Sequence, residues 1–261
     1  VDERDPADRD VAAEGVSDDG AGGRSRIGPG RREGEDGQEP RGAHTPTTIP
    51  PVRDNFPPMK LVSFGEPGLE MPGVVQGEKV LDLCMADSSL PPSLRAILEE
   101  DLLARIRALL AAAPADCWVE AARVRFGPPI PDPRNIICLG LNYRDHAEEM
   151  KMEMPKSPLL FSKAAGAIAG AYDPIPLGTA SKTVDIEAEL AVVIGKACKG
   201  LSESDAPGAI AGYTILNDVS GRDLQFGDKQ WYRGKSQDGY APFGPFLATP
   251  DAIPAPHALR N

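Results

Sequence analysis

The sequence lacks the features that would direct a chain of 261 residues to a membrane or to nucleic acid. No run of about 18 apolar residues occurs, so no membrane-spanning helix is expected. The 28 lysines and arginines are outnumbered by 39 acidic residues, and the formal net charge is -11. They form no cluster of the kind that binds a phosphate backbone or anionic lipid. The chain also begins without a positive segment followed by an apolar one, so no secretory signal peptide is expected.

Cysteine and histidine are scarce. The cysteines are far apart and form no CxxC pair, which argues against a zinc ribbon: Cys84, Cys117, Cys138 and Cys198. They fit small buried hydrophobes in a reducing compartment, so a cytoplasmic location is expected. Of the three histidines, only His146 lies away from the ends of the chain.

Three segments differ in composition. Residues 1–58 are rich in glycine, proline, acids and arginine and show no apolar periodicity, so a disordered tail is expected. Alternatively they are an upstream extension, because Met59 opens MKLVSFGEPG, which looks like the start of a protein. Residues 59–133 are expected to form a small N-terminal α+β domain and a linker, and residues 134–261 a larger domain.

Local patterns predict the main elements of the small domain. Residues Lys60–Phe64 alternate as in a strand. Apolar residues at helical spacing predict one helix over Leu94–Leu110, with Ser93 as its N-cap. No internal repeat of 20–50 residues is present, which argues against a solenoid.

The segment SKTVDIEAELAVVIGK predicts one apolar strand over Val184–Ile194 that carries acids on one face. Glu187 and Glu189 are two positions apart, so their Cα atoms are about 6.5–7 Å apart on the same side. Buried carboxylates cost several kcal/mol unless a cation compensates them, and a hard divalent ion with oxygen ligands would do so. An edge strand with a solvated outer face explains the pattern equally well.

Further candidate residues follow two other segments. GYTILNDVSGRDLQ places Asp218 at the end of an apolar strand, where a rigid support suits a metal ligand. His146 and Glu149 lie three positions apart on a predicted helix, and a carboxylate beside an imidazole suits a general base. Lys235 precedes a glycine- and proline-rich loop and would neutralise a substrate carboxylate or enolate. Taken singly, each also fits a structural role. Asp218 would form a turn or cap a helix, His146 and Glu149 would be an incidental surface pair, and Lys235 would be a solvated charge.

Taken together, four ordered segments resemble the fumarylacetoacetate hydrolase family: NIICLGLNYRDHAEEM, SKTVDIEAELAVVIGK, GYTILNDVSGRDLQ and QWYRGKSQDGYAPFGP. The resemblance implies a mostly β, α+β fold with a rolled mixed sheet, and a homodimer. It also implies one Mg²⁺ or Mn²⁺ ion held by Glu187, Glu189 and Asp218. Asp185 would be a neighbour of this set rather than a ligand.

The resemblance likewise implies the catalytic roles. The His146–Glu149 pair would activate water, and Lys235 would stabilise developing negative charge. Gln225 and Tyr143, together with Lys235, would bind substrate. Arg222 and Asp223 match a pair that is expected to support the structure.

The implied function is metal-dependent hydrolysis of a C–C bond in small β-diketo or 2-keto acids, as in the catabolism of aromatic compounds. Isomerisation or decarboxylation of 2-hydroxymuconate-type compounds and ureidoglycolate cleavage are alternatives on the same scaffold. The sequence departs from the family pattern because no Gly-Thr-Pro loop follows before Asn261, and Ala164 stands where proline is common. An inactive, C-terminally truncated remnant is therefore the second hypothesis. A third is a structural domain whose acids face solvent.

Overall fold

The computed structural model describes residues 58–149, 151, 153–178 and 180–259. The segment expected to be disordered, residues 1–58, lies outside these ranges except for its last residue. In the described part of the chain, no helix is both long and apolar enough to cross a membrane. Strands dominate, and the expected mostly β, α+β class is confirmed.

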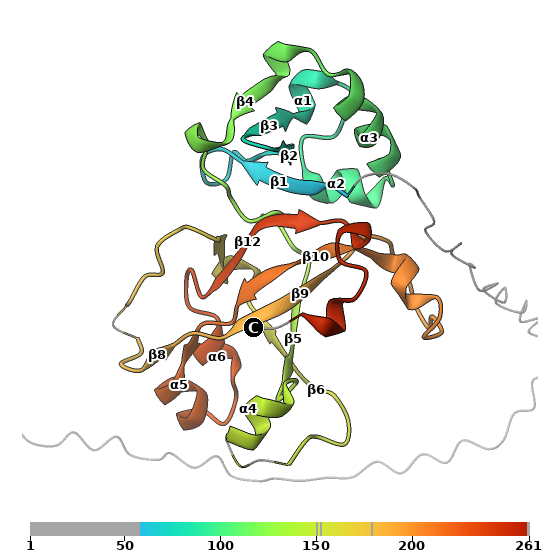
Figure 1. Ribbon diagram of the computed structural model, residues 1–261. Coiled ribbons are helices and arrows are strands. Elements are labelled where there is room, and N and C mark those ends of the chain that lie inside the picture. The colour runs from blue at the N-terminus through green and yellow to red at the C-terminus, as the bar shows by residue number, and fades with distance from the viewer. Residues whose placement is uncertain (1–57, 150, 152, 179, 260–261) are drawn as a thin grey trace, which may run out of the picture. The chain divides into compact units, whose positions relative to one another are not determined.

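An eight-stranded, mainly antiparallel sheet forms the centre of the fold, with strand order β4-β3-β2-β1-β12-β10-β9 and β7 paired in parallel with β12. Its strands are β1 (Lys60–Phe64), β2 (Met71–Gln76), β3 (Lys79–Asp82), β4 (Trp118–Glu120), β7 (Ile168–Gly170), β9 (Ala188–Ile194), β10 (Ile210–Asn217) and β12 (Ala241–Ala248). Figure 1 shows β9, β10 and β12 running side by side. Because β1 pairs with β12, the sheet contains strands from both segments that were expected to form domains.

Two smaller sheets each contain two antiparallel strands, β5 (Ile136–Gly140) with β6 (Leu159–Lys163), and β8 (Val184–Asp185) with β11 (Ser220–Gly221). The α-helices are α1 (Leu83–Ala86), α2 (Leu94–Glu99), α3 (Leu103–Ala112), α4 (Arg144–Glu149), α5 (Arg222–Gly227) and α6 (Tyr232–Lys235). The described residues also form short 3-10 turns: η1 (Ala115–Cys117), η2 (Ala121–Arg123), η3 (Ala165–Ala167), η4 (Ala206–Ala209), η5 (Pro250–Ala252) and η6 (Pro256–Ala258).

The single helix predicted over Leu94–Leu110 is wrong, because the chain forms α2 and α3 with a break between them. Asp101 adopts a left-handed conformation with φ 57. Its N–H donates to the carbonyl of Leu98, and the N–H of Leu102 donates to the carbonyl of Ile97, each at 3.1 Å. These two bonds form a Schellman motif, which ends α2. The predicted N-cap is confirmed, since Ser93 Oγ accepts from the N–H of Ala96 at 3.1 Å.

The break allows both helices to bury apolar side chains in one core. Ile97 on α2 and Ile106 on α3 are fully buried, as are Leu61 on β1 and Leu83 on α1. This core continues to Leu216 on β10, so it also packs against a strand that carries the candidate site.

The single strand predicted over Val184–Ile194 is also wrong, since it divides into β8 and β9. Asp185 pairs with Ser220 of β11, whereas Ala188 pairs with Asn217 of β10. The chain therefore moves from one sheet to another at residues 186–187. The physical reason is that the side chain of Asn217 accepts the N–H of Glu187 at 3.0 Å and replaces a ladder hydrogen bond.

Candidate metal centre

The break between β8 and β9 lies opposite a matching break between β10 and β11. Residues 186–187 face residues 218–219, because the flanking pairs on either side are regular. One backbone hydrogen bond spans the gap, from the N–H of Asp218 to the carbonyl of Glu187 at 2.8 Å. Two acidic residues from distant parts of the sequence are thereby placed against each other.

Glu187, Glu189 and Asp218 form an acidic triad, with one ligand atom from each lying within 4.8 Å of the others. Asp218 is fully buried, whereas the two glutamates are partly exposed. The three residues come from the sheet break, from β9 and from the end of β10. Oxygen ligands at this separation can hold a hard divalent cation such as Mg²⁺ or Mn²⁺.

Two buried lysines contact the triad. Lys235 Nζ donates to Glu187 Oε2 at 2.7 Å and to Asp218 Oδ2 at 2.6 Å. Lys163 Nζ donates to the other oxygen of Asp218 at 2.6 Å and to the Val219 carbonyl at 3.1 Å. Asp218 therefore receives one ammonium group on each carboxylate oxygen.

Lys235 reaches the triad because α6 packs closely against α5. A Cβ atom at Gly234 would lie 2.7 Å from the backbone nitrogen of Gln225, so this contact requires glycine. The Lys235 ammonium also lies 5.2 Å from the centre of the Phe161 ring, a cation–π distance.

A guanidinium group completes the charged cluster. Arg222 Nη2 lies 2.6 Å from Glu187 Oε1 and 2.7 Å from Asp185 Oδ2. Its Nη1 donates to Gln225 Oε1 at 2.9 Å. The structure thus links Asp185 and Gln225 to the triad through Arg222. The carboxylate of Asp223 instead accepts hydrogen bonds from the Ser181 hydroxyl and the N–H of Lys182.

The two glutamates of the triad differ in electrostatic environment. Burial would raise the pKa of Glu187, but hydrogen bonds and charges from Lys235 and Arg222 outweigh it and hold this pKa below its ordinary value. Burial and then the charges of Asp218 and Glu187 raise the pKa of Glu189 to about 7. Among the described residues, none donates a hydrogen bond to the side-chain carboxylate of Glu189 or forms an ion pair with it. A divalent cation would satisfy this carboxylate, so the donor set fits a metal ion.

Of the remaining predicted residues, the structure places Tyr143 against β9. Tyr143 Oη accepts the N–H of Leu190 at 3.1 Å, which attaches the segment before α4 to the strand of Glu189. His146 and Glu149 lie on α4, as the sequence predicts for the helix, but their side chains lie outside what the structure describes. Their pairing remains a prediction.

Lys163 is the member of the cluster that the sequence did not indicate. It ends β6, a strand in which three of the four preceding residues are apolar, and it is 3% exposed. Burial lowers its pKa, and the charge of Asp218 opposes this shift. A lone lysine at the end of an apolar strand is a weak signal, because the partner carboxylate is 55 positions away.

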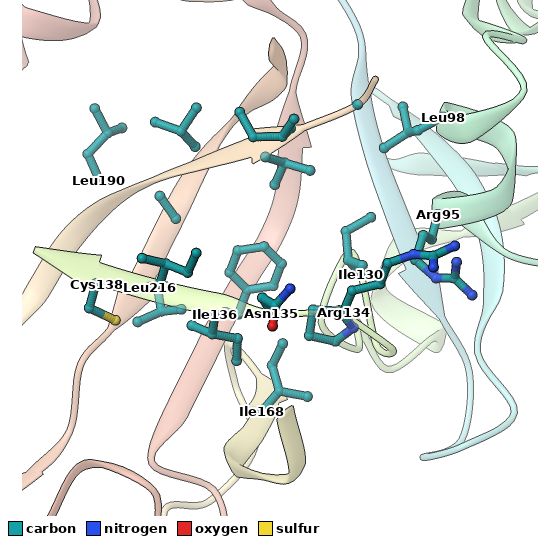
Figure 2. Close-up of a pocket in the computed structure, with 18 of the residues that line it drawn as sticks. Arg95, Leu98, Ile130, Arg134, Asn135, Ile136, Cys138, Ile168, Leu190 and Leu216 are labelled. Carbon is teal, nitrogen blue, oxygen red and sulfur yellow. The ribbon is translucent and has the colours of Figure 1, made fainter. Parts of the chain in front are cut away.

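An apolar cavity of about 1060 Å³ runs along β5 and β9. Figure 2 shows Ile130, Ile136 and Ile168 along it, with Arg95 and Arg134 together at one end. Of the triad, only Glu189 lines this cavity. A small, strongly polar ligand is therefore better matched by the charged cluster than by the cavity.

Similarity to known proteins agrees with this combination of fold and site. Residues 135–261 match the model of the fumarylacetoacetate (FAA) hydrolase C-terminal family. The chain is 42% identical over 210 residues to the mitochondrial oxaloacetate tautomerase Fahd2a of Rattus norvegicus, covering 77% of this chain and 66% of the relative. It is 41% identical over 219 residues to the mitochondrial oxaloacetate tautomerase FAHD2B of Bos taurus, covering 80% of this chain and 68% of the relative. The chain thus spans about two thirds of the length of these relatives.

Solved structures of similar proteins include two hydrolases. Fumarylacetoacetate hydrolase from Exiguobacterium antarcticum matches with a TM-score of 0.60 and 35% identity, over 75% of this chain and 68% of that one. Maleylpyruvate hydrolase from Sphingobium sp. SYK-6, in complex with manganese(II) and pyruvate, matches with a TM-score of 0.59 and 28% identity. This match covers 76% of this chain and 70% of that one.

A mostly β fold that gathers three carboxylates within 4.8 Å of one another defines a class of proteins with a candidate divalent-metal site. Within that class, this chain belongs to the fumarylacetoacetate hydrolase family. The resemblance stated from four sequence segments is confirmed.

Proposed function

We propose that this chain catalyses keto–enol chemistry on small dicarboxylic 2-oxo acids with the help of Mg²⁺ or Mn²⁺, and that tautomerisation of an oxaloacetate-like substrate is its reaction. The acidic triad with two buried lysines carries the proposal. The tautomerase names of the relatives support this substrate class.

Glu187, Glu189 and Asp218 would hold the metal ion. When bound, such an ion polarises a carbonyl group and stabilises the negative charge of an enolate. The fully buried position of Asp218 and the attachment of Glu189 to a regular strand keep the ligands in place without substrate. Acids at a sheet break are therefore held more firmly than acids on a loop would be, which suits metal ligands.

The cationic residues would recognise the substrate. Lys235 presents a buried ammonium group that can donate to a substrate carboxylate or to the enolate oxygen. Gln225 is 5% exposed and is held by Arg222, so its amide nitrogen remains available as a donor. Tyr143 would border the substrate beside Leu190. In this proposal His146, oriented by Glu149, moves the proton between carbon and oxygen.

Hydrolysis of a C–C bond in an acylpyruvate is the second candidate. The likeness to a maleylpyruvate hydrolase whose structure contains manganese(II) and pyruvate favours it. The two reactions would share the enolate and differ in whether His146 activates a water molecule. Only hydrolysis releases a second product, so an analysis of the products distinguishes the two reactions.

The test is a metal-dependent assay with the purified chain. Loss of the enol absorbance of oxaloacetate measures tautomerisation, and a coupled lactate dehydrogenase assay of pyruvate release from an acylpyruvate measures hydrolysis. Glu187→Gln and Glu189→Gln are expected to lower turnover by at least about 100-fold, since each removes a ligand charge. Glu203→Gln changes an exposed glutamate away from the triad and serves as the matched control. Undiminished turnover in EDTA would refute both candidates.

A further inference from the structure

Lysine and arginine side chains already contact most of the carboxylate oxygens that a metal ion would use. Both oxygens of Asp218 and both oxygens of Glu187 already contact a lysine or an arginine. Only Glu189 has no such partner among the described residues. A metal ion that uses the whole triad therefore has to share or replace an existing contact.

Lys235 occupies the position that conflicts with the metal. Its ammonium group bridges Glu187 Oε2 and Asp218 Oδ2 at 2.7 Å and 2.6 Å, and these residues are two of the three members of the triad. A Mg²⁺ ion lies about 2.1 Å from its oxygen ligands. Two cations on the same pair of oxygens would be only a few ångströms apart in a buried position, where their repulsion is strong.

Lys163 differs from Lys235 in how it is held. Lys163 lies on a strand, its side chain is fully buried, and it also donates to the carbonyl of Val219. Both hydrogen bonds of the Lys235 ammonium go to triad carboxylates. Lys235 ends a four-residue helix, and the nearby Phe161 ring offers its ammonium group a second favourable contact.

We propose that Lys235 is an exchangeable internal counter-ion: its ammonium group links Glu187 to Asp218 in the metal-free protein, and the incoming divalent ion displaces it. The released ammonium group is then free to meet an anionic substrate, so metal loading prepares the substrate site. Lys163 stays on Asp218 and acts as a positioning residue. This inference rests on the proposed metal site.

The test is lysine labelling of the full chain with an amine-acylating reagent, with and without manganese(II) chloride, analysed by mass spectrometry. The acylation rate of Lys235 is expected to rise at least about fivefold with Mn²⁺, because the ammonium group leaves a position that is 2% exposed. Lys163 is the buried internal control and should remain protected. Lys196, whose side chain is 40% exposed, should react at the same rate in both states.

Electron paramagnetic resonance of free Mn²⁺ provides an independent measurement. The variant Lys235→Met should bind Mn²⁺ at least about fivefold more tightly than the unmodified chain, since the competing charge is gone. Lys196→Met should leave the affinity unchanged. If Mn²⁺ binds while Lys235 stays protected from acylation, the displacement is overturned and the metal site is kept. Weaker Mn²⁺ binding by Lys235→Met than by the unmodified chain would have the same meaning. Absence of Mn²⁺ binding in both proteins would overturn the metal site and the displacement together.

Discussion

The apolar core around α2 and α3 and the charged cluster at the β8–β9 break are both buried, but different forces hold them. Ile97, Ile106 and Leu83 are fully enclosed by other apolar side chains. Asp218 and Lys235 are as well enclosed, yet their neighbours are charged. Apolar packing contributes stability that is nearly independent of pH and metal, whereas a charged cluster depends on which charges are present. Only the second kind of region can respond to a ligand ion.

The strongest test of this difference is Asp218→Asn. The change removes the carboxylate shared by Lys163 and Lys235 and leaves two buried ammonium groups without full compensation. We expect a loss of about 3–5 kcal/mol in the free energy of unfolding, measured by urea denaturation. As a control, Asp101→Asn breaks an exposed ion pair with Lys196 and should cost less than about 1 kcal/mol. Equal losses in the two variants would contradict the role assigned to burial.

The matching change in the apolar core is Ile97→Ala. Its side chain is fully buried, so truncation should cost about 3 kcal/mol through lost burial and the cavity that remains. This loss should be the same at pH 5 and pH 8, and the same in EDTA and in Mn²⁺. A loss that depends on metal would show that the two regions are energetically coupled.

The pH dependence of stability distinguishes Glu189 from the apolar core. Its pKa is raised to about 7 from an ordinary 4.5, so folding favours the protonated carboxyl group. The resulting cost is absent below about pH 4, grows as pH rises towards 7 and is complete above it. In EDTA at pH 8, Glu189→Gln should therefore be about 2 kcal/mol more stable than the unmodified chain, after allowance for partial solvent exposure.

At pH 4 the same two proteins should unfold at the same urea concentration. Saturating Mn²⁺ should reverse the order at pH 8, because the ion binds the ionised carboxylate. If Glu189→Gln is not stabilising in EDTA, another group compensates the charge of Glu189.

The smallest expected effect belongs to Ser93→Ala. This change removes the hydrogen bond to the N–H of Ala96 that begins α2. We expect a loss of about 1 kcal/mol by urea denaturation, with no change in Mn²⁺ affinity. Ser93→Asp keeps an N-cap acceptor and should retain stability. A change in metal affinity would contradict the expectation that a local change at the start of α2 leaves the charged cluster unaltered.

Local sequence was sufficient for elements that local forces decide. Strand β1 has the predicted bounds, and Ser93 caps α2, because alternation and capping involve neighbouring residues only. The broken helix was missed because Asp101, rather than glycine, adopts the left-handed conformation that ends α2. Composition alone gives no such signal, since aspartate takes this conformation only occasionally.

The family and the identity of the acidic candidates follow from the amino-acid sequence alone, because they depend only on the order of four segments and the residue types within them. The contacts that those acids make depend on the three-dimensional fold. The split of the predicted strand directs Asp185 to Arg222 and Glu187 to Asp218. It also brings Lys163 onto Asp218 from 55 positions away. Such pairings depend on sheet register and burial, which are set by contacts between segments that sequence periodicity does not connect.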